Sequence, residues 1–114
     1  MVRNALFHRV QLWARRRWYD LGELDRAAGW DAERWGEAVR AYFAEHDEVG
    51  TGADARGPGL LIVDKSEPGV WRVRQILDDP AGDHDWGIDV EVDLDASDEV
   101  GSAVLRLVDA GRKD

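Results

Sequence analysis

The stretch Trp86-Gly-Ile-Asp-Val-Glu-Val-Asp-Leu94 alternates apolar residues with a glycine and three acids, without error. This period of two is typical of a β-strand with one face on a core and the other in water. A slip of one residue would bury the three carboxylates, so only one register satisfies the pattern. We therefore expect a strand whose apolar face is covered by a second layer.

Three further segments have the composition of strands. They are Leu60–Asp64, Val70–Leu77 and Ala103–Val108. The connections between consecutive strands are short, and a parallel return needs about a dozen residues or more, so we expect an antiparallel meander. In that sheet Trp71 and Val73 share the core face, and Arg72 and Arg74 face the acids of the third strand.

The front half of the chain has helical periodicity. Apolar residues recur at helical spacing from Asn4 to about Asp20, which predicts a first helix. Gly22 and Gly29 bound a short segment, Glu23–Ala28, that is either one helical turn or a connector. Asp31 is placed to cap the N-terminus of a second long helix. The glycine-rich segment Glu48–Gly59 then forms the main loop before the strands.

These elements predict one α+β domain over residues 1–114, with N-terminal helices packed on one face of a four-stranded antiparallel meander sheet. The layout is similar to the nuclear-transport-factor-like cone, a fold that often encloses a pocket. In such a cone we expect a set of aromatic and imidazole side chains near the cavity: Trp35, Tyr42, His46, Trp71 and Trp86.

The composition excludes several classes of protein. There is no cysteine, so disulfides and thiolate metal sites are excluded and a cytoplasmic location is expected by default. No apolar segment approaches the eighteen or so residues that span a bilayer, so no membrane association is expected.

Charge is divided unevenly along the chain. Residues 1–40 hold eight arginines and six acids (+2), and residues 41–114 hold seven basic and eighteen acidic side chains (−11), which together give the net charge of −9. No acid precedes Asp20, so the start of the chain is a local basic segment. Its arginines either pair with acids of the sheet or of a partner, or contact single-stranded nucleic acid together with a neighbouring aromatic ring. The candidate contacts are Arg9, Arg15, Arg16, Arg17 and Trp18.

The segment Ile76–Trp86 concentrates four aspartates and a histidine. The spacing matches no metal-binding template, and Pro80-Ala-Gly82 is good turn chemistry, so we interpret the segment as a long hairpin connection. A docking surface for a protein is the alternative, with Asp79, Asp83, His84 and Asp85 as its contacts. No metal, cofactor or catalytic residue is predicted, since the three histidines lie on different elements and no P-loop lysine follows the glycines.

Several strings resemble the C-terminal domain of unknown function that is appended to DEAD/DEAH-box ATP-dependent helicases, chiefly of actinobacteria. They are Arg3–Val10, Ala41–Gly52, Ala55–Pro58, Trp71–Ile88 and Asp93–Glu99. The helicase ATPase motifs themselves do not occur in the chain, so no catalytic residue of that family can be assigned here.

The resemblance implies a non-catalytic accessory domain whose partners are helicase motor domains, in cis or in trans. Contact with RNA or DNA would be indirect, and a homodimer is left open. Two alternatives stand beside this interpretation: a small-ligand-binding or enzymatic cone-fold domain with an aromatic pocket, and single-stranded nucleic-acid contact through the basic N-terminal helix.

Overall fold

The chain forms three main helices followed by a four-stranded sheet, in a computed structural model that describes residues 2–101 and 104–113. The helices are α1 (Val2–Ala14), α2 (Trp18–Asp25) and α3 (Ala32–Glu45), and a short helix α4 (Leu94–Val100) lies between the last two strands. The α+β prediction is confirmed. None of the described helices is long and apolar enough to cross a membrane.

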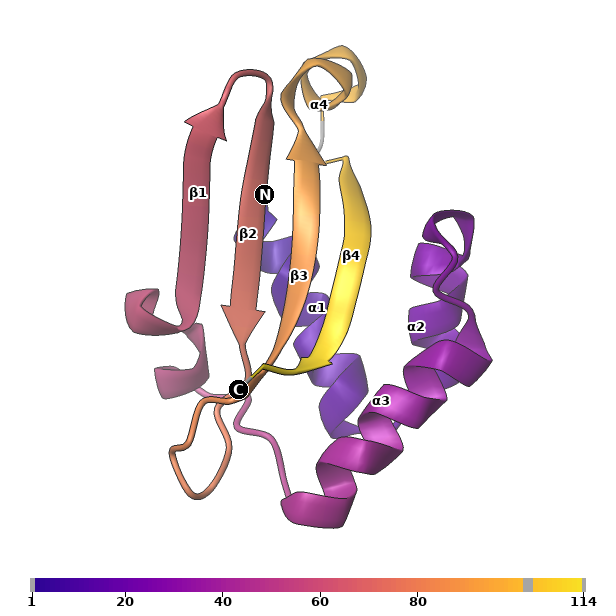
Figure 1. Cartoon of the computed structure of the whole chain (residues 1–114), viewed down its shortest axis with the longest axis vertical. Helices are drawn as coiled ribbons and strands as arrows, with labels where there is room; N and C mark the ends of the chain where they lie inside the picture. The colour runs from indigo at the N-terminus through magenta and orange to yellow at the C-terminus, as the bar shows by residue number, and fades with distance from the viewer. Residues whose placement is uncertain (1, 102–103, 114) are drawn as a thin grey trace.

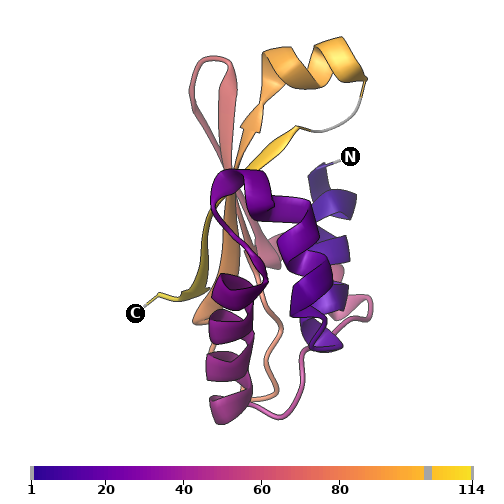
Figure 2. The same ribbon diagram turned by 90° about the vertical axis from the view of Figure 1, so that its right-hand side faces the viewer.

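The sheet is an antiparallel meander in the order β1-β2-β3-β4. Its strands are β1 (Leu61–Glu67), β2 (Val70–Ile76), β3 (Trp86–Asp93) and β4 (Leu105–Arg112). Helix α1 lies behind the sheet, and α2 and α3 lie beside β4 (Figures 1 and 2). Within the described residues, no helix lies over the other face of the sheet (Figures 1 and 2). The predicted start of the fourth strand, Ala103, lies outside the described residues.

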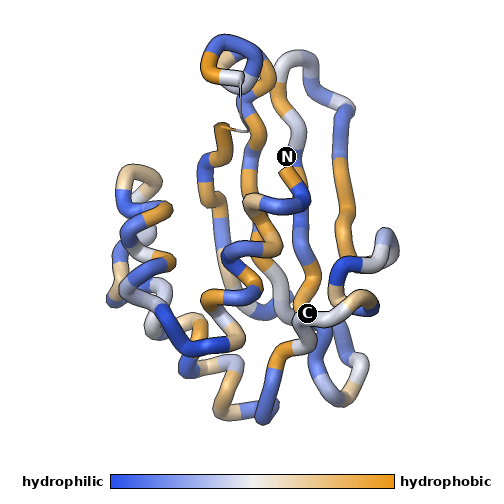
Figure 3. The backbone as a smooth tube through the Cα atoms, turned by 180° about the vertical axis from the view of Figure 1, so that it is seen from behind, coloured by the Kyte–Doolittle hydropathy of each residue, from blue (hydrophilic) through white to orange (hydrophobic). Residues whose placement is uncertain are grey.

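Strand β3 has the predicted register. Ile88, Val90 and Val92 are at most 1% exposed, and they face the core with Val73 of β2 and Leu107 of β4. Orange and blue alternate along the strands in Figure 3, which views the sheet from the helical side. On the opposite face Arg72 pairs with Glu91 and Arg74 with Asp89, as the sequence predicts.

The predicted first helix, Asn4 to Asp20, is in fact two helices. After Ala14 the backbone of Arg16 is left-handed (φ 57°), the Arg16 N–H donates to the Trp13 carbonyl, and the Arg17 N–H donates to the Leu12 carbonyl. This pair of bonds is a Schellman motif, which ends α1 and turns the chain into α2. Glycine is the usual residue at a left-handed position. Because arginine stands there instead, the end of α1 has no recognisable signal in the sequence.

The prediction that Gly22 bounds a segment is wrong. Gly22 lies inside α2. A Cβ built at Gly22 would stand 2.4 Å from the backbone nitrogen of Ala32, at the start of α3. The glycine therefore allows the two helix backbones to approach each other. The second long helix is as predicted: Asp31 is its N-cap, and its side chain accepts a hydrogen bond from the Arg34 N–H at 3.0 Å.

Helix α4 occupies most of the short connection between the third and fourth predicted strands, where the sequence analysis expects no helix. The Asp93 carboxylate caps it by accepting the Ala96 N–H at 3.0 Å, and Gly101 ends it in a left-handed conformation. Strand β3 consequently stops at Asp93, and Leu94 begins the helix although it continues the alternating pattern. The main loop, Glu48–Gly59, is also more regular than predicted, because it contains two short 3-10 turns.

The contact between α2 and α3 can be tested with Gly22→Ala. Alanine favours a helix by about 1 kcal/mol over glycine, but its methyl group has no room here, and overpacking costs about 1–3 kcal/mol. We expect a net loss of stability in urea unfolding. Gly52→Ala is the control, because a Cβ there meets no atom within 4 Å. Equal stability of the two variants would show that the helices separate easily.

Candidate functional site

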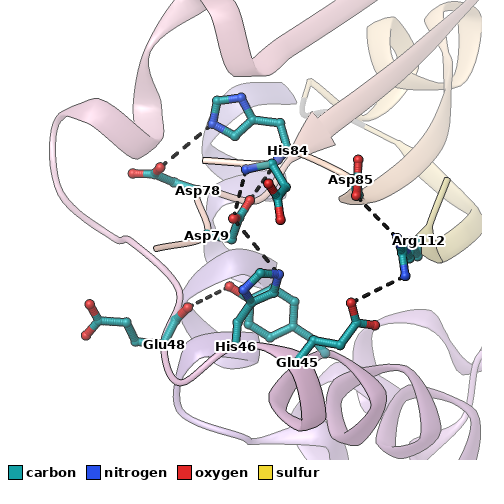
Figure 4. Close-up of polar contacts among 10 residues, drawn as sticks. Glu45, His46, Glu48, Asp78, Asp79, His84, Asp85 and Arg112 are labelled. Atoms are coloured by element: carbon teal, nitrogen blue, oxygen red, sulfur yellow. Dashed lines mark hydrogen bonds and ion pairs between the residues drawn. The ribbon is translucent and has the colours of Figure 1, made fainter. Parts of the chain in front are cut away.

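The C-terminus of α3 meets the loop between β2 and β3 at one end of the molecule (Figure 4). The two segments are joined by backbone, because the Gly50 N–H donates to the Asp78 carbonyl at 2.9 Å. The loop is closed at its base by the Leu77 N–H, which donates to the Trp86 carbonyl at 2.9 Å. This junction contains all four residues of the predicted docking loop.

Asp79 organises the loop from inside. Its carboxylate is buried, and its two oxygens accept the backbone N–H groups of Asp83 at 3.0 Å and His84 at 2.8 Å. His84 is held in the left-handed region (φ 59°) by this arrangement. Burial by itself raises the pKa of Asp79, but the hydrogen bonds from His84 and Asp83, with the nearby His46, outweigh it and leave the pKa lowered. Asp79 therefore holds its negative charge inside the junction.

His46 lies against Asp79 from the end of α3. Its Nε2 is 3.9 Å from the Asp79 Oδ2, and its side chain is 10% exposed. The imidazole also packs on the Tyr42 ring, with centroids 5.1 Å apart. The sequence analysis groups His46 with the aromatic residues, and the structure places it between Tyr42 and the aspartate loop.

The remaining acids of the loop have different surroundings. Asp83 is exposed, and His84 points away from Asp79, with its Nε2 4.0 Å from the Asp78 Oδ1. Asp85 pairs with Arg112, which also reaches Glu45 of α3 at 3.4 Å. The structure thus brings Asp79 and Asp83 together with His46. The side chains of His84 and Asp85 point away from Asp79 (Figure 4).

The aromatic residues expected around a cavity are packed against one another instead. Trp35, Tyr42 and Trp86 are at most 4% exposed. Tyr42 meets Trp86 edge to face at 5.5 Å, and Trp13 meets both Trp35 and Tyr42 in the same way at about 6 Å. These rings fill the core, which is the use that aromatic side chains most often have in a small domain. The expectation of an aromatic pocket is therefore not met at these positions.

Among the described residues, the polar atom of Tyr42 has a hydrogen-bond partner, whereas those of three buried tryptophans have none. The Tyr42 hydroxyl donates to the Glu48 carbonyl at 2.6 Å. Trp13, Trp35 and Trp86 have buried indole N–H groups without an acceptor among the described residues. Trp71, the fifth pocket candidate, is half-buried on β2, with the Lys65 ammonium 4.4 Å from its ring centroid. Its position is at the margin of the core.

The basic segment is only partly available to a partner. Arg9 is a correction, because it is 7% exposed and forms a two-bond ion pair with the buried Asp25, at 3.0 and 2.7 Å. Arg16 lies over the Phe43 ring at 3.8 Å, and Arg17 pairs with Asp20 at 2.6 Å, although both arginines remain exposed. A buried arginine requires a buried carboxylate, but sequence alone does not reveal which one.

Charges on the open face of the sheet neutralise one another. Arg74 pairs with Asp89 at 2.8 Å, and Lys113 approaches the same carboxylate at 3.3 Å. Arg72 and Arg106 both pair with Glu91. A surface hollow of about 290 Å³ lies over these residues. Among its lining charges, Arg72, Arg74, Asp89, Glu91 and Lys113 have partners of opposite sign, and the Asp64 carboxylate accepts the Ser66 N–H at 2.9 Å.

The described residues contain no assembled nucleophile and base. Within residues 2–101 and 104–113, no hydrogen bond joins a histidine side chain to a hydroxyl group, and His8, His46 and His84 lie on separate elements. A general base needs hydrogen-bond reach to the group that it deprotonates. The junction is a polar surface with a buried carboxylate and a largely buried imidazole at its centre.

Fold and site together define an α+β domain with helices on one face of an antiparallel meander and a polar junction at one end. The chain belongs to the family described as a domain of unknown function, DUF3516, whose model matches residues 1–110. No curated protein and no solved structure shows a significant match to the chain.

The capping role of Asp79 predicts a specific loss of stability in Asp79→Ala. The substitution removes two part-buried hydrogen bonds to a charged carboxylate, and hydrogen bonds to charged groups each contribute about 1.5–3 kcal/mol. We expect the free energy of unfolding, measured with urea in EDTA-containing buffer, to fall by at least that amount. Asp83→Ala removes an exposed carboxylate from the same loop and should change it by less than about 0.5 kcal/mol. Similar losses in both variants would contradict the capping role.

Proposed function

We propose that this domain is a non-catalytic interaction module of an ATP-dependent helicase that remodels RNA or DNA. The proposal is supported by the serial strings that resemble the domain appended to DEAD/DEAH-box helicases, which extend from Arg3 to Glu99. Membership of a family over residues 1–110 is consistent with a module of this size. Its partners would be the helicase motor domains, in cis or in trans.

The packed aromatic core is the observation that favours interaction over small-molecule binding. A ligand pocket of the cone type needs aromatic side chains at its wall. Here Trp35, Tyr42 and Trp86 are buried in the core, where they make edge-to-face contacts with other rings. What the domain offers instead is a charged surface around a rigid core. Surfaces of that kind recognise macromolecules through electrostatic complementarity.

Deletion of the domain from its helicase tests this function. We expect basal ATP hydrolysis to remain, because the motor motifs lie outside this chain, and unwinding or partner binding to fall. Adding the separate domain in trans should restore part of the lost activity if it docks on the motor. Unchanged ATPase, unwinding and binding after deletion would count decisively against the proposal.

Direct contact with single-stranded nucleic acid is a second candidate, and the exposed end of α1 favours it. Arg15, Arg16 and Arg17 are all exposed there, and Tyr19 is 75% exposed one residue beyond Trp18. Trp18 is half-buried with the Arg40 guanidinium 5.4 Å from its ring centroid. Exposed rings beside arginines can stack bases while the charges hold phosphates.

Salt dependence separates this candidate from indirect binding. If the three arginines each neutralise one phosphate of a single strand, the logarithm of the affinity should fall against the logarithm of salt with a slope of about −2. Fluorescence anisotropy with labelled oligo(dT) and oligo(U) measures the slope, and Arg15→Ala/Arg17→Ala should flatten it to about −0.7. Arg26→Ala is the matched control, an exposed arginine outside the segment. Absence of binding even at low salt would eliminate direct contact.

A further inference from the structure

We propose that His46, Asp79 and Asp83 form a binding site for one divalent transition-metal ion, with Zn²⁺ as the ion whose preferences fit the set best. The inference goes beyond the proposed function, and it holds or fails independently of any helicase. It also departs from the sequence prediction of no metal, because the sequence shows only the two aspartates near each other.

The geometry brings three ligand atoms to one point. One atom from each of His46, Asp79 and Asp83 lies within 4.8 Å of the other two. In a tetrahedral zinc site with bonds of about 2.0–2.2 Å, neighbouring ligand atoms stand about 3.4 Å apart. The His46 Nε2 and the Asp79 Oδ2 are at 3.9 Å. Small side-chain rotations are therefore enough to place all three atoms around an ion.

The surroundings of His46 are a second observation in favour of the site. Its side chain is nine-tenths buried, and among the described residues its imidazole makes no hydrogen bond. The Nε2 atom is directed at Asp79 but stands too far away for a hydrogen bond (Figure 4). The imidazole nitrogens of His46 are not among the fully buried unsatisfied atoms, but the imidazole is largely buried and its Nε2 faces a carboxylate at 3.9 Å, which is a favourable setting for a metal ligand. A metal ion would bind the lone pair of the unprotonated His46 Nε2 atom.

Asp79 has capacity left for an ion. Each of its carboxylate oxygens accepts one backbone N–H, from Asp83 and His84. Since a carboxylate oxygen has two lone pairs, Oδ2 retains one on the side of His46. The two N–H bonds fix the orientation of the carboxylate, as the outer-shell partners of metal ligands do in known sites. Asp79 would be the rigid ligand, and the exposed Asp83 the adjustable one.

The ligand types select the ion. Imidazole suits Zn²⁺, Ni²⁺ and Cu²⁺, whereas Mg²⁺ prefers all-oxygen octahedral sites. One imidazole and two carboxylates supply three ligands and leave a fourth position for solvent or a partner's side chain. Because His46 ends α3 and both aspartates belong to the β2–β3 loop, the ion would fasten the helix to the sheet at this junction.

The neighbouring pair of His84 and Asp78 gives a comparison within the same loop. The His84 Nε2 is 4.0 Å from the Asp78 Oδ1, but the imidazole is 43% exposed and the pair belongs to no three-residue group among the described residues. An ion held here would be bound weakly by solvated side chains. Substitution of a residue of this pair, such as Asp78→Asn, therefore serves as a control for nonspecific binding of the ion to the loop.

The test is a calorimetric titration of ZnCl₂ into the tag-free, EDTA-treated chain, with thermal unfolding beside it. We expect one ion per chain and a raised Tm with Zn²⁺, and no shift with Mg²⁺. Asp83→Asn and His46→Gln should each weaken the affinity by about tenfold or more. The controls Asp78→Asn and His8→Gln should change the affinity by less than about twofold, because neither side chain belongs to the three-residue group. This change is much smaller than the one expected on losing a ligand.

Asp83→Asn keeps the test decisive if His46→Gln disturbs the fold, because the Asp83 side chain is exposed. A stoichiometry other than one overturns the proposal. So does wild-type affinity in Asp83→Asn, or an equal loss of affinity in His8→Gln or Asp78→Asn. Loss of helicase activity on deleting the domain has no bearing on these outcomes, so the two proposals can fail separately.

Discussion

The register of β3 is the constraint on which the rest of the structure depends. Strand β3 pairs with a neighbour on both sides, and its inward residues Ile88, Val90 and Val92 are almost fully buried. Moving the strand by one residue would exchange them for Asp89 and Glu91, at a cost of many kcal/mol in desolvated charge. The same register sets the arginines of β2 opposite those acids, so the ion pairs of the open face follow from hydrophobic burial.

Local patterns were enough to predict the architecture, but they missed two boundaries. Alternation identified the sheet, and Asp31 identified the start of α3, because both signals act within a few residues. The sequence does not predict the end of α1, because Arg16 occupies a left-handed position where glycine is usual. Helix α4 was not predicted, although Asp93 and Gly101 are good capping residues. The alternating pattern extends through Leu94 and favours a longer strand instead. Competing local signals are resolved only by tertiary packing.

The candidate site was predictable only in pieces. The turn residues between Ile76 and Trp86 predict a loop, and Asp79 within it acts through its own backbone neighbours. The arrival of His46 beside Asp79 depends on where α3 ends relative to the sheet, which no spacing in the sequence encodes. The buried pairing of Arg9 with Asp25 is a second example, in which two helices bring together charges sixteen residues apart. Both cases join polar groups through tertiary geometry.

The two edges of the sheet are unlike, and this limits how copies of the domain can join. Helix α3 flanks β4, whereas β1 has a neighbour on one side only and is exposed along most of its length (Figures 1 and 2). The β1 edge has no helix beside it and is the more open of the two for strand addition. Two copies that met through β1 would form a symmetric pair in which both β1 edges are used.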